Sequence, residues 1–171
     1  IARSGARIGF IDEILGESGL PAHALELEIT ETMALLHGGG PVSMLADLRR
    51  RGARVAVDDF GIGYSSLSYL RELPIDTVKL DASFIRELGR RREDSKIVGA
   101  VIQLAHGLGM EVVAEGVEEE EQMAILEMLY CDKMQGFLFS RALEPLAFEN
   151  LMDASVPFQT ARAPSRSPAL R

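Results

Sequence analysis

The chain has 171 residues, of which 47% are hydrophobic, 26% are charged and 6% are aromatic, a composition typical of one globular domain with its own core. Its 26 acidic and 18 basic side chains give a formal net charge of −8, which disfavours binding to DNA or RNA polymers. The single cysteine excludes an internal disulfide framework and favours a cytoplasmic protein, and no apolar run is long enough to span a membrane.

Hydrophobic periodicity predicts helices and strands that alternate along the chain. Each apolar repeat is bounded by Gly, Pro, Ser or acidic residues of the kind that end strands and cap helices. In chain order we expect a helix over 10–17, a strand over 25–31, a helix from Pro41 to Gly52, a strand over 54–58, a short helix carrying Leu67 and Leu70, a strand over 76–81, a helix over 94–106, a strand over 111–114, a helix from Glu118, a strand over 133–135 and a helix over 145–152.

The repeated strand–helix order predicts an α/β fold with a parallel sheet and helices outside it. We expect this domain to occupy residues 1–156. Residues 157–171 are rich in Pro, Ser, Ala and Arg, and we expect them to form a disordered tail.

Charged and polar side chains stand where each predicted strand ends. They are Glu28 and Glu31, Asp58 and Asp59, Lys79, Glu115, and Gln135. Because ligands bind beyond the carboxyl ends of parallel strands, we expect these side chains to form one site. Carboxylates without neighbouring His or Cys favour a hard divalent cation, Mg²⁺ or Mn²⁺, over zinc.

The pair Asp58-Asp59 lies at the centre of this predicted site. Neighbouring side chains of a strand point to opposite faces, so both carboxylates reach one site only if the strand stops and the backbone turns. Gly61 and Gly63 would permit that turn. Two simpler interpretations stay open: an ordinary turn in which the aspartates bond backbone N–H groups, and ion pairs from Lys79 to Asp58 or Glu115.

Five short motifs follow one another at these strand ends. They are Glu28-Ile29-Thr30-Glu31, Asp58-Asp59-Phe60-Gly61-Ile62-Gly63-Tyr64-Ser65-Ser66, Val78-Lys79-Leu80-Asp81, Ala114-Glu115-Gly116-Val117-Glu118 and Asp132-Lys133-Met134-Gln135-Gly136. As a set they resemble the EAL domain family of bacterial cyclic di-GMP phosphodiesterases, over residues 11–152. The resemblance implies a partial (β/α)8 TIM-type barrel of about five C-terminal βα units. It also implies two bound Mg²⁺ or Mn²⁺ ions and hydrolysis of cyclic di-GMP to linear pGpG.

The resemblance also implies a role for each strand-end residue. Glu28 and Asp58 are implied ligands of one ion, with Asp58 shared by a second ion whose surroundings include Asp59 and Glu115. The implied catalytic residues are Lys79, Asp59 and Glu115, with Lys79 at the catalytic water. Gln135 and Asp81 are implied substrate contacts, and Glu31 is the implied anchor of the loop after Asp59.

The chain departs from the family pattern in two respects. The Glu-Ala-Leu motif and a metal-binding Asn of the family do not occur, and their spacing would place them before Ile1. We therefore expect the intact domain to be the phosphodiesterase and residues 1–171 alone to be weak or inactive. The alternative is a catalytically degenerate receptor that binds cyclic di-GMP. The family further implies a homodimer formed through the barrel and an upstream sensory or GGDEF-type domain, with membrane tethering through segments before residue 1.

Overall fold

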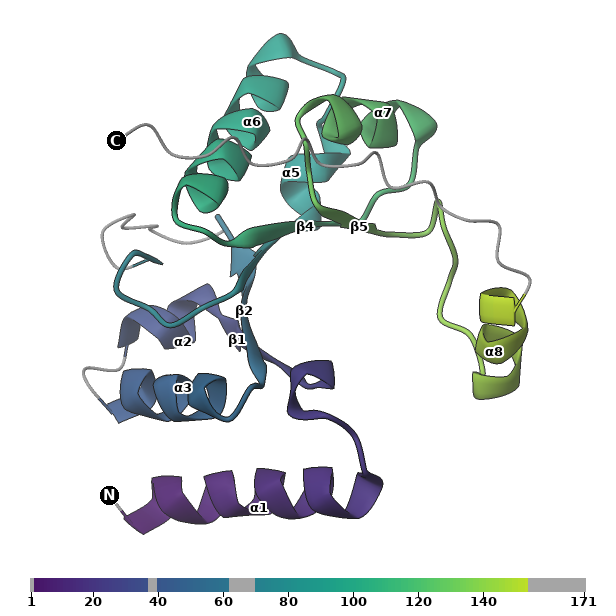
Figure 1. The fold of residues 1–171 in the computed structure, drawn as a ribbon. Coiled ribbons are helices and arrows are strands. Elements are labelled where there is room, and N and C mark those ends of the chain that lie inside the picture. The colour runs from purple at the N-terminus through teal and green to yellow at the C-terminus, as the bar shows by residue number, and fades with distance from the viewer. Residues whose placement is uncertain (1, 37–39, 62–69, 154–171) are drawn as a thin grey trace, which may run out of the picture.

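The structure, a computed structural model, describes residues 2–36, 40–61 and 70–153. Its centre is a parallel sheet of five strands in the order β1-β2-β3-β4-β5, drawn in Figure 1. The strands are β1 (Glu26–Thr30), β2 (Arg54–Phe60), β3 (Thr77–Leu80), β4 (Glu111–Glu115) and β5 (Lys133–Gln135). The predicted α/β class and all five predicted strands are confirmed.

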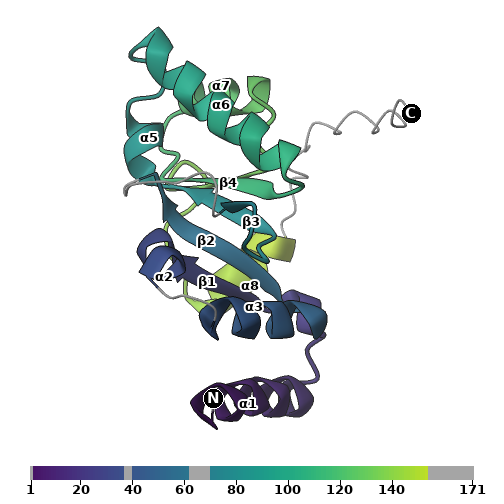
Figure 2. The ribbon, with the colours of Figure 1, turned by 90° about the vertical axis from the view of Figure 1, so that its left-hand side faces the viewer.

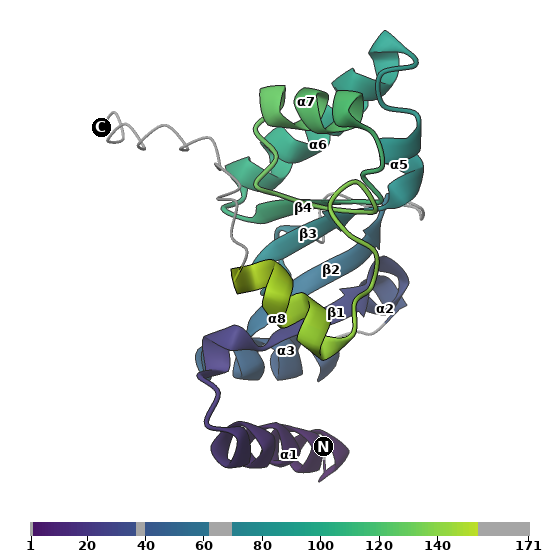
Figure 3. The same cartoon turned by 90° about the vertical axis from the view of Figure 1, so that its right-hand side faces the viewer.

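Helices cover one side of this curved sheet. They are α2 (Glu31–Leu36), α3 (Gly40–Arg50), α5 (Ala82–Arg86), α6 (Arg92–Gly107) and α7 (Glu120–Met128). Three further elements do not belong to this layer: α1 (Ala2–Ser18), which lies beyond α3, the 3₁₀ turn η1 (Ala22–Ala24) and α8 (Pro145–Asp153). Figures 1 and 2 show α2, α3, α5, α6 and α7 on the convex side. Figure 3 shows α8 in front of the opposite, concave side.

Alternate strand residues form the core between the sheet and its covering helices. Val57, Val78 and Val112 are fully buried and pack with Ile102 of α6 and Leu126 of α7. Burying each such side chain contributes roughly 1.5–3 kcal/mol relative to leaving it in water. The apolar positions face the helices, so the intervening polar positions are left on the concave face.

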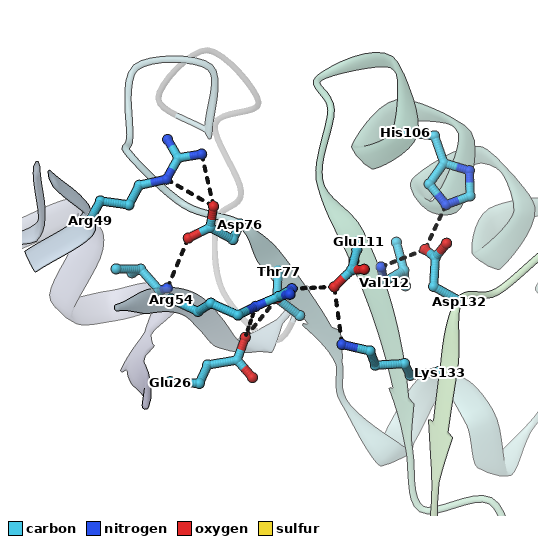
Figure 4. Close-up of polar contacts among 11 residues, drawn as sticks. Glu26, Arg49, Arg54, Asp76, Thr77, His106, Glu111, Val112, Asp132 and Lys133 are labelled. Carbon is cyan, nitrogen blue, oxygen red and sulfur yellow. Dashed lines mark hydrogen bonds and ion pairs between the residues drawn. The ribbon is translucent and has the colours of Figure 1, made fainter. Parts of the chain in front are cut away.

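The concave face carries a network of charged side chains near the amino ends of the strands, shown in Figure 4. Thr77 Oγ1 donates to Glu26 Oε1 at 2.7 Å, and Arg54 Nη2 donates to Thr77 Oγ1 at 3.1 Å. Arg54 also pairs with Glu111, which accepts from Lys133 Nζ at 3.0 Å. This network gives Glu26 a structural role that its place in the strand pattern did not reveal.

Two short helices and one strand end differ from the sequence prediction. The helices α2 and α5 have six and five residues, too few for a periodic stripe to reveal them. Strand β2 continues past Asp58 to Phe60 instead of stopping there. The predicted helix near Leu67 and the predicted tail lie outside the described residues.

The helix α1 forms as its periodicity predicts, but its stripe is not buried. Phe10 is 62% exposed and Ile14 is 45% exposed, because α1 lies beyond α3 and away from the sheet, as Figure 1 shows. Met33, Met128 and Met152 are likewise exposed on the surfaces of their helices. Within the described ranges, no helix is both long and apolar enough to cross a membrane.

Candidate active site

The side chain of Lys79 connects three carboxylates that come from three other strands. Its Nζ lies 2.9 Å from Glu28 Oε1 on β1, 3.2 Å from Asp58 Oδ1 on β2 and 2.8 Å from Glu115 Oε1 on β4. The Lys79 side chain is only 10% exposed, whereas Glu28 is 49% exposed. The parallel sheet therefore brings four predicted site residues together at one cation.

Two opposed effects act on the pKa of Lys79. Burial disfavours the charged ammonium, but hydrogen bonds to Glu115, Glu28 and Asp58 favour it more and raise the pKa above its usual value. Lys79 therefore stays protonated at neutral pH. Of the interpretations left open by the sequence, ion pairs from Lys79 to both Asp58 and Glu115 are present, and Glu28 joins them.

The aspartate pair lies on a β-bulge. Val57 pairs with Val78 and Phe60 pairs with Leu80, so Asp58 and Asp59 stand opposite the single residue Lys79. Asp59 has a left-handed backbone with φ of 56°, and its N–H donates to Asp58 Oδ1 at 3.0 Å. A bulge re-aims side chains without ending the strand, which corrects the prediction that the strand must stop at Asp58.

Glu31 anchors the backbone just after the bulge. It is the first residue of α2 and is only 2% exposed. Its Oε2 accepts a hydrogen bond from the Gly61 N–H at 2.9 Å. Glu31 therefore lies where the family resemblance placed a loop anchor.

The two residues expected to contact a substrate differ in their surroundings. Asp81 is the N-cap of α5, and its Oδ1 accepts from the Ser83 N–H at 2.9 Å. Hydrogen bonding by the Ser83 side chain lowers the pKa of Asp81, and the backbone N–H groups of Ser83 and Ala82 lower it further. Gln135 ends β5 opposite Glu115, and its side chain is exposed at the same end of the sheet. Gln135 is the last residue of β5 and Asp81 comes directly after β3, so both lie at the end of the sheet that carries the Lys79 cluster.

The donor set around Lys79 is suited to a hard cation. Its ligand atoms are carboxylate oxygens that already converge on one ammonium, and oxygen donors are what Mg²⁺ and Mn²⁺ prefer. In the described part of the chain, however, no three His, Cys, Asp or Glu side chains gather closely enough to hold a metal ion by themselves. Lys79 occupies the place on which these carboxylates converge.

Residues 3–142 match the family described as the EAL domain. This match covers well over half of the sequence. The chain belongs to the EAL domain family.

Known EAL proteins resemble it in sequence and in structure. It is 42% identical to the cyclic di-GMP phosphodiesterase NbdA of Pseudomonas aeruginosa over 151 residues, which are 86% of this chain and 19% of NbdA. The EAL domain of Mycobacterium smegmatis DcpA is 42% identical with a TM-score of 0.79, over 84% of this chain and 65% of that one. Klebsiella pneumoniae BlrP1, solved as a manganese and cyclic di-GMP complex, is 36% identical with a TM-score of 0.74, over 78% of this chain and 34% of that one.

These likenesses confirm the predicted fold class, in which the five parallel strands correspond to part of a TIM-type EAL barrel. The chain spans about a fifth of the length of NbdA.

Two features of this candidate site were not predicted from the sequence. The bulge was missed because it depends on backbone angles and strand register, which residue types do not specify. The cap of α5 had a usable signal, since Asp81 followed by Ser83 is a typical helix start.

Proposed function

We propose that the EAL domain to which these strands belong hydrolyses cyclic di-GMP to linear pGpG with two divalent metal ions. The observation that carries the proposal is the convergence of Glu28, Asp58 and Glu115 on the Lys79 ammonium. Such a group of carboxylates has no role in forming the core, which lies on the other face of the sheet. The names of NbdA and of the BlrP1 complex support this substrate and a divalent cation.

We assign the metal ligands by the family motifs and the observed positions. Glu28 and Asp58 would hold one ion, and Asp58, Asp59 and Glu115 would surround the other. Bound ions would supply an activated water and would neutralise charge on the phosphate oxygens. The bulge serves this assignment because it sets two consecutive aspartates opposite one residue of β3.

Lys79, Gln135, Asp81 and Glu31 complete the proposed site. Lys79 would hold the water or a phosphate oxygen as a hydrogen-bond donor once cations compensate the carboxylates that it now pairs. Gln135 and Asp81 would contact the substrate, and Glu31 would hold the backbone at Gly61.

The test is conversion of cyclic di-GMP to pGpG by the natural protein, followed by chromatography with Mg²⁺ or Mn²⁺ added. Asp58→Asn keeps the shape of the side chain but removes its charge, and we expect kcat to fall by at least about 100-fold. Asp132→Asn is the matched control, since Asp132 bonds His106 and the Val112 N–H near the start of β4. No turnover by the unchanged protein with either metal would refute the proposal.

Further measurements test the remaining expectations, namely the receptor alternative, the weak activity of residues 1–171, the homodimer and the upstream domain. Calorimetric binding of cyclic di-GMP without turnover would favour the receptor alternative. An assay of residues 1–171 alone tests the expectation of weak activity. Light scattering of the natural protein tests the expected homodimer, and its full sequence tests for a sensory or GGDEF-type domain.

A further inference from the structure

The bulge holds Asp59 and Gly61 in backbone conformations that need support from their neighbours. Asp59 has φ of 56° and Gly61 has φ of 99°, and both values lie in the left-handed region. This region is unfavourable for any residue with a Cβ, although Asp tolerates it better than most. Such a conformation persists where the surrounding structure holds it in place.

Two side chains from neighbouring helices contact the backbone at Gly61. Glu31 of α2 accepts the Gly61 N–H at 2.9 Å. On the other side, the ring of Phe84 fills the space that a Cβ on Gly61 would need, with ring atoms Cε2 and Cζ overlapping that position. One contact is polar and one is apolar, and together they fix the segment directly after the aspartate pair.

The position of Phe84 is itself tied to the strand that carries Lys79. Strand β3 ends at Leu80, Asp81 caps α5, and the Phe84 N–H donates to the Asp81 carbonyl oxygen at 3.1 Å. The Phe84 ring is partly buried and packs against the core. It therefore joins the β3 side of the site to the bulge of β2.

We propose that Phe84 is a positioning residue for the aspartate pair. Its ring holds the backbone at Gly61 and thereby keeps Asp59 in the left-handed conformation that presents both aspartates to one cation site. Phe84 itself touches neither metal nor substrate. The effects on Mn²⁺ binding and on hydrolysis rest on the function proposed above, whereas the effect on the backbone at Gly61 does not.

The experiment compares Phe84→Ala and Phe84→Leu with the unchanged protein. Leu108→Ala is the matched control, because Leu108 is also partly buried against the core but precedes β4 at the other end of the sheet. Mn²⁺ binding is followed by electron paramagnetic resonance, and hydrogen exchange is measured at the Gly61 amide. Thermal unfolding of each variant reports the general loss of packing.

We expect Leu108→Ala and Phe84→Ala both to lower the unfolding temperature. Phe84→Ala, unlike Leu108→Ala, should raise the Kd for Mn²⁺ about tenfold and speed hydrogen exchange at the Gly61 amide. Phe84→Leu should give values between those of the unchanged protein and those of Phe84→Ala. In the activity assay, Phe84→Ala should raise the Mn²⁺ concentration for half-maximal rate while kcat at saturating Mn²⁺ changes little. A merely structural role would produce the fall in unfolding temperature without these shifts.

A second variant keeps the proposal testable if Phe84→Ala does not fold. Gly61→Ala places a methyl group against the Phe84 ring, and we expect it too to weaken Mn²⁺ binding. Adding Phe84→Leu to Gly61→Ala should recover part of the loss, because the two residues are in contact. Three results would each overturn the proposal. The first is that the Phe84 variants that fold keep the Mn²⁺ affinity and the Gly61 exchange rate of the unchanged protein. The second is strictly additive effects in the double variant, and the third is no Mn²⁺ binding by the unchanged protein. Absence of turnover alone would overturn only the proposed hydrolysis.

Discussion

Lys79 lies on the inner face of β3, where burial alone would favour the neutral amine. Three carboxylates reverse that preference and raise the pKa of Lys79, so the side chain remains an ammonium. A protonated lysine has no lone pair with which to accept a proton, so Lys79 paired with these three carboxylates is a hydrogen-bond donor. Because its folded-state pKa is raised, the stability that these ion pairs provide is present below its unfolded pKa of about 10.4 and is lost only as pH rises through the folded value.

The ionised carboxylate of Glu111 contributes to stability, and this contribution is lost in acid. Burial raises its pKa, but hydrogen bonds to Lys133 and Arg54 outweigh burial and lower it below the usual value. Its contribution is therefore present above the unfolded pKa of about 4.3 and is lost as pH falls through the lower folded value. We expect Glu111→Gln to reduce stability at neutral pH and to flatten the loss of stability below about pH 4.

Urea unfolding across this pH range measures that effect. Glu127→Gln on the exposed face of α7 is the control and should leave the profile unchanged. If the stability of Glu111→Gln fell with pH in the same way as that of the unchanged protein, protonation of Glu111 would not be a cause of the loss of stability in acid.

Close contacts between successive loops connect the elements at the carboxyl end of the sheet. A Cβ on Gly61 would meet Phe84, one on Gly116 would meet Ala82, and one on Gly136 would meet the backbone of Val117. Each glycine lies within three residues of a strand end that carries a proposed site residue. The segments that follow β2, β3, β4 and β5, including the start of α5, thus contact one another in the order of their strands.

Gly136 is the position where a side chain has least room. Its Cβ would overlap the backbone of Val117, whose N–H donates to the Gln135 carbonyl at 3.0 Å and whose carbonyl accepts from the Leu138 N–H at 3.0 Å. We expect Gly136→Ala to destabilise the protein by about 1–3 kcal/mol, because rigid backbone must shift. Gly107→Ala in α6 meets no atom within 4 Å and should stabilise by about 0.5–1 kcal/mol. Thermal unfolding of both variants checks this, and equal effects would contradict it.

The cap of α5 separates the structural and functional roles of Asp81. Asp81→Ala removes the bond to the Ser83 N–H and should cost about 1 kcal/mol, whereas Asp81→Asn keeps an acceptor and most of the stability. If Asp81 also contacts the substrate, Asp81→Asn should raise the KM for cyclic di-GMP while the unfolding temperature stays near that of the unchanged protein. A normal KM in Asp81→Asn would restrict Asp81 to the cap.

Periodicity in the sequence was sufficient for the central strands and for α6, because each buries an apolar face that repeats along the chain. It also predicted α1 and α8, whose large apolar side chains stay exposed. The convergence of Glu28, Asp58, Lys79 and Glu115 also followed from the rule that parallel strands end at one edge. The bulge, the two shortest helices and the contact of Phe84 with Gly61 could not be predicted in this way. They depend on register and on contacts between distant segments, which residue spacing does not encode.

At the scale of the whole molecule, the sheet has one apolar face, which packs against the helices, and one polar face, on which the charged side chains form two layers. On the concave side, the charged network at the amino ends of the strands and the Lys79 cluster at the carboxyl ends are separated by Ala56 and Val113. The buried face is built around the central strands, where Val55, Val57, Val78, Leu80 and Val112 are fully buried. The sheet is therefore most strongly held in its middle.

Hydrogen exchange should reflect this arrangement. We expect the slowest backbone amides in β2, β3 and β4, which are paired on both sides, and faster exchange in β1 and β5 at the edges of the described sheet. Exchange measured by nuclear magnetic resonance checks the order. Protection in β5 equal to that in β3 would show that its outer edge is covered by further structure.

The uneven charge of the two polar layers bears on the order in which ligands arrive. The amino-end layer balances Glu26 and Glu111 with Arg54 and Lys133. Among the described residues, the carboxyl-end layer pairs Glu28, Asp58 and Glu115 with the single cation of Lys79, so we expect it to repel an anionic dinucleotide until cations bind. We therefore expect an ordered kinetic scheme in which divalent cations enter first. Calorimetry should show tight binding of cyclic di-GMP only after Mn²⁺ is added, and equal affinity with and without Mn²⁺ would indicate random order.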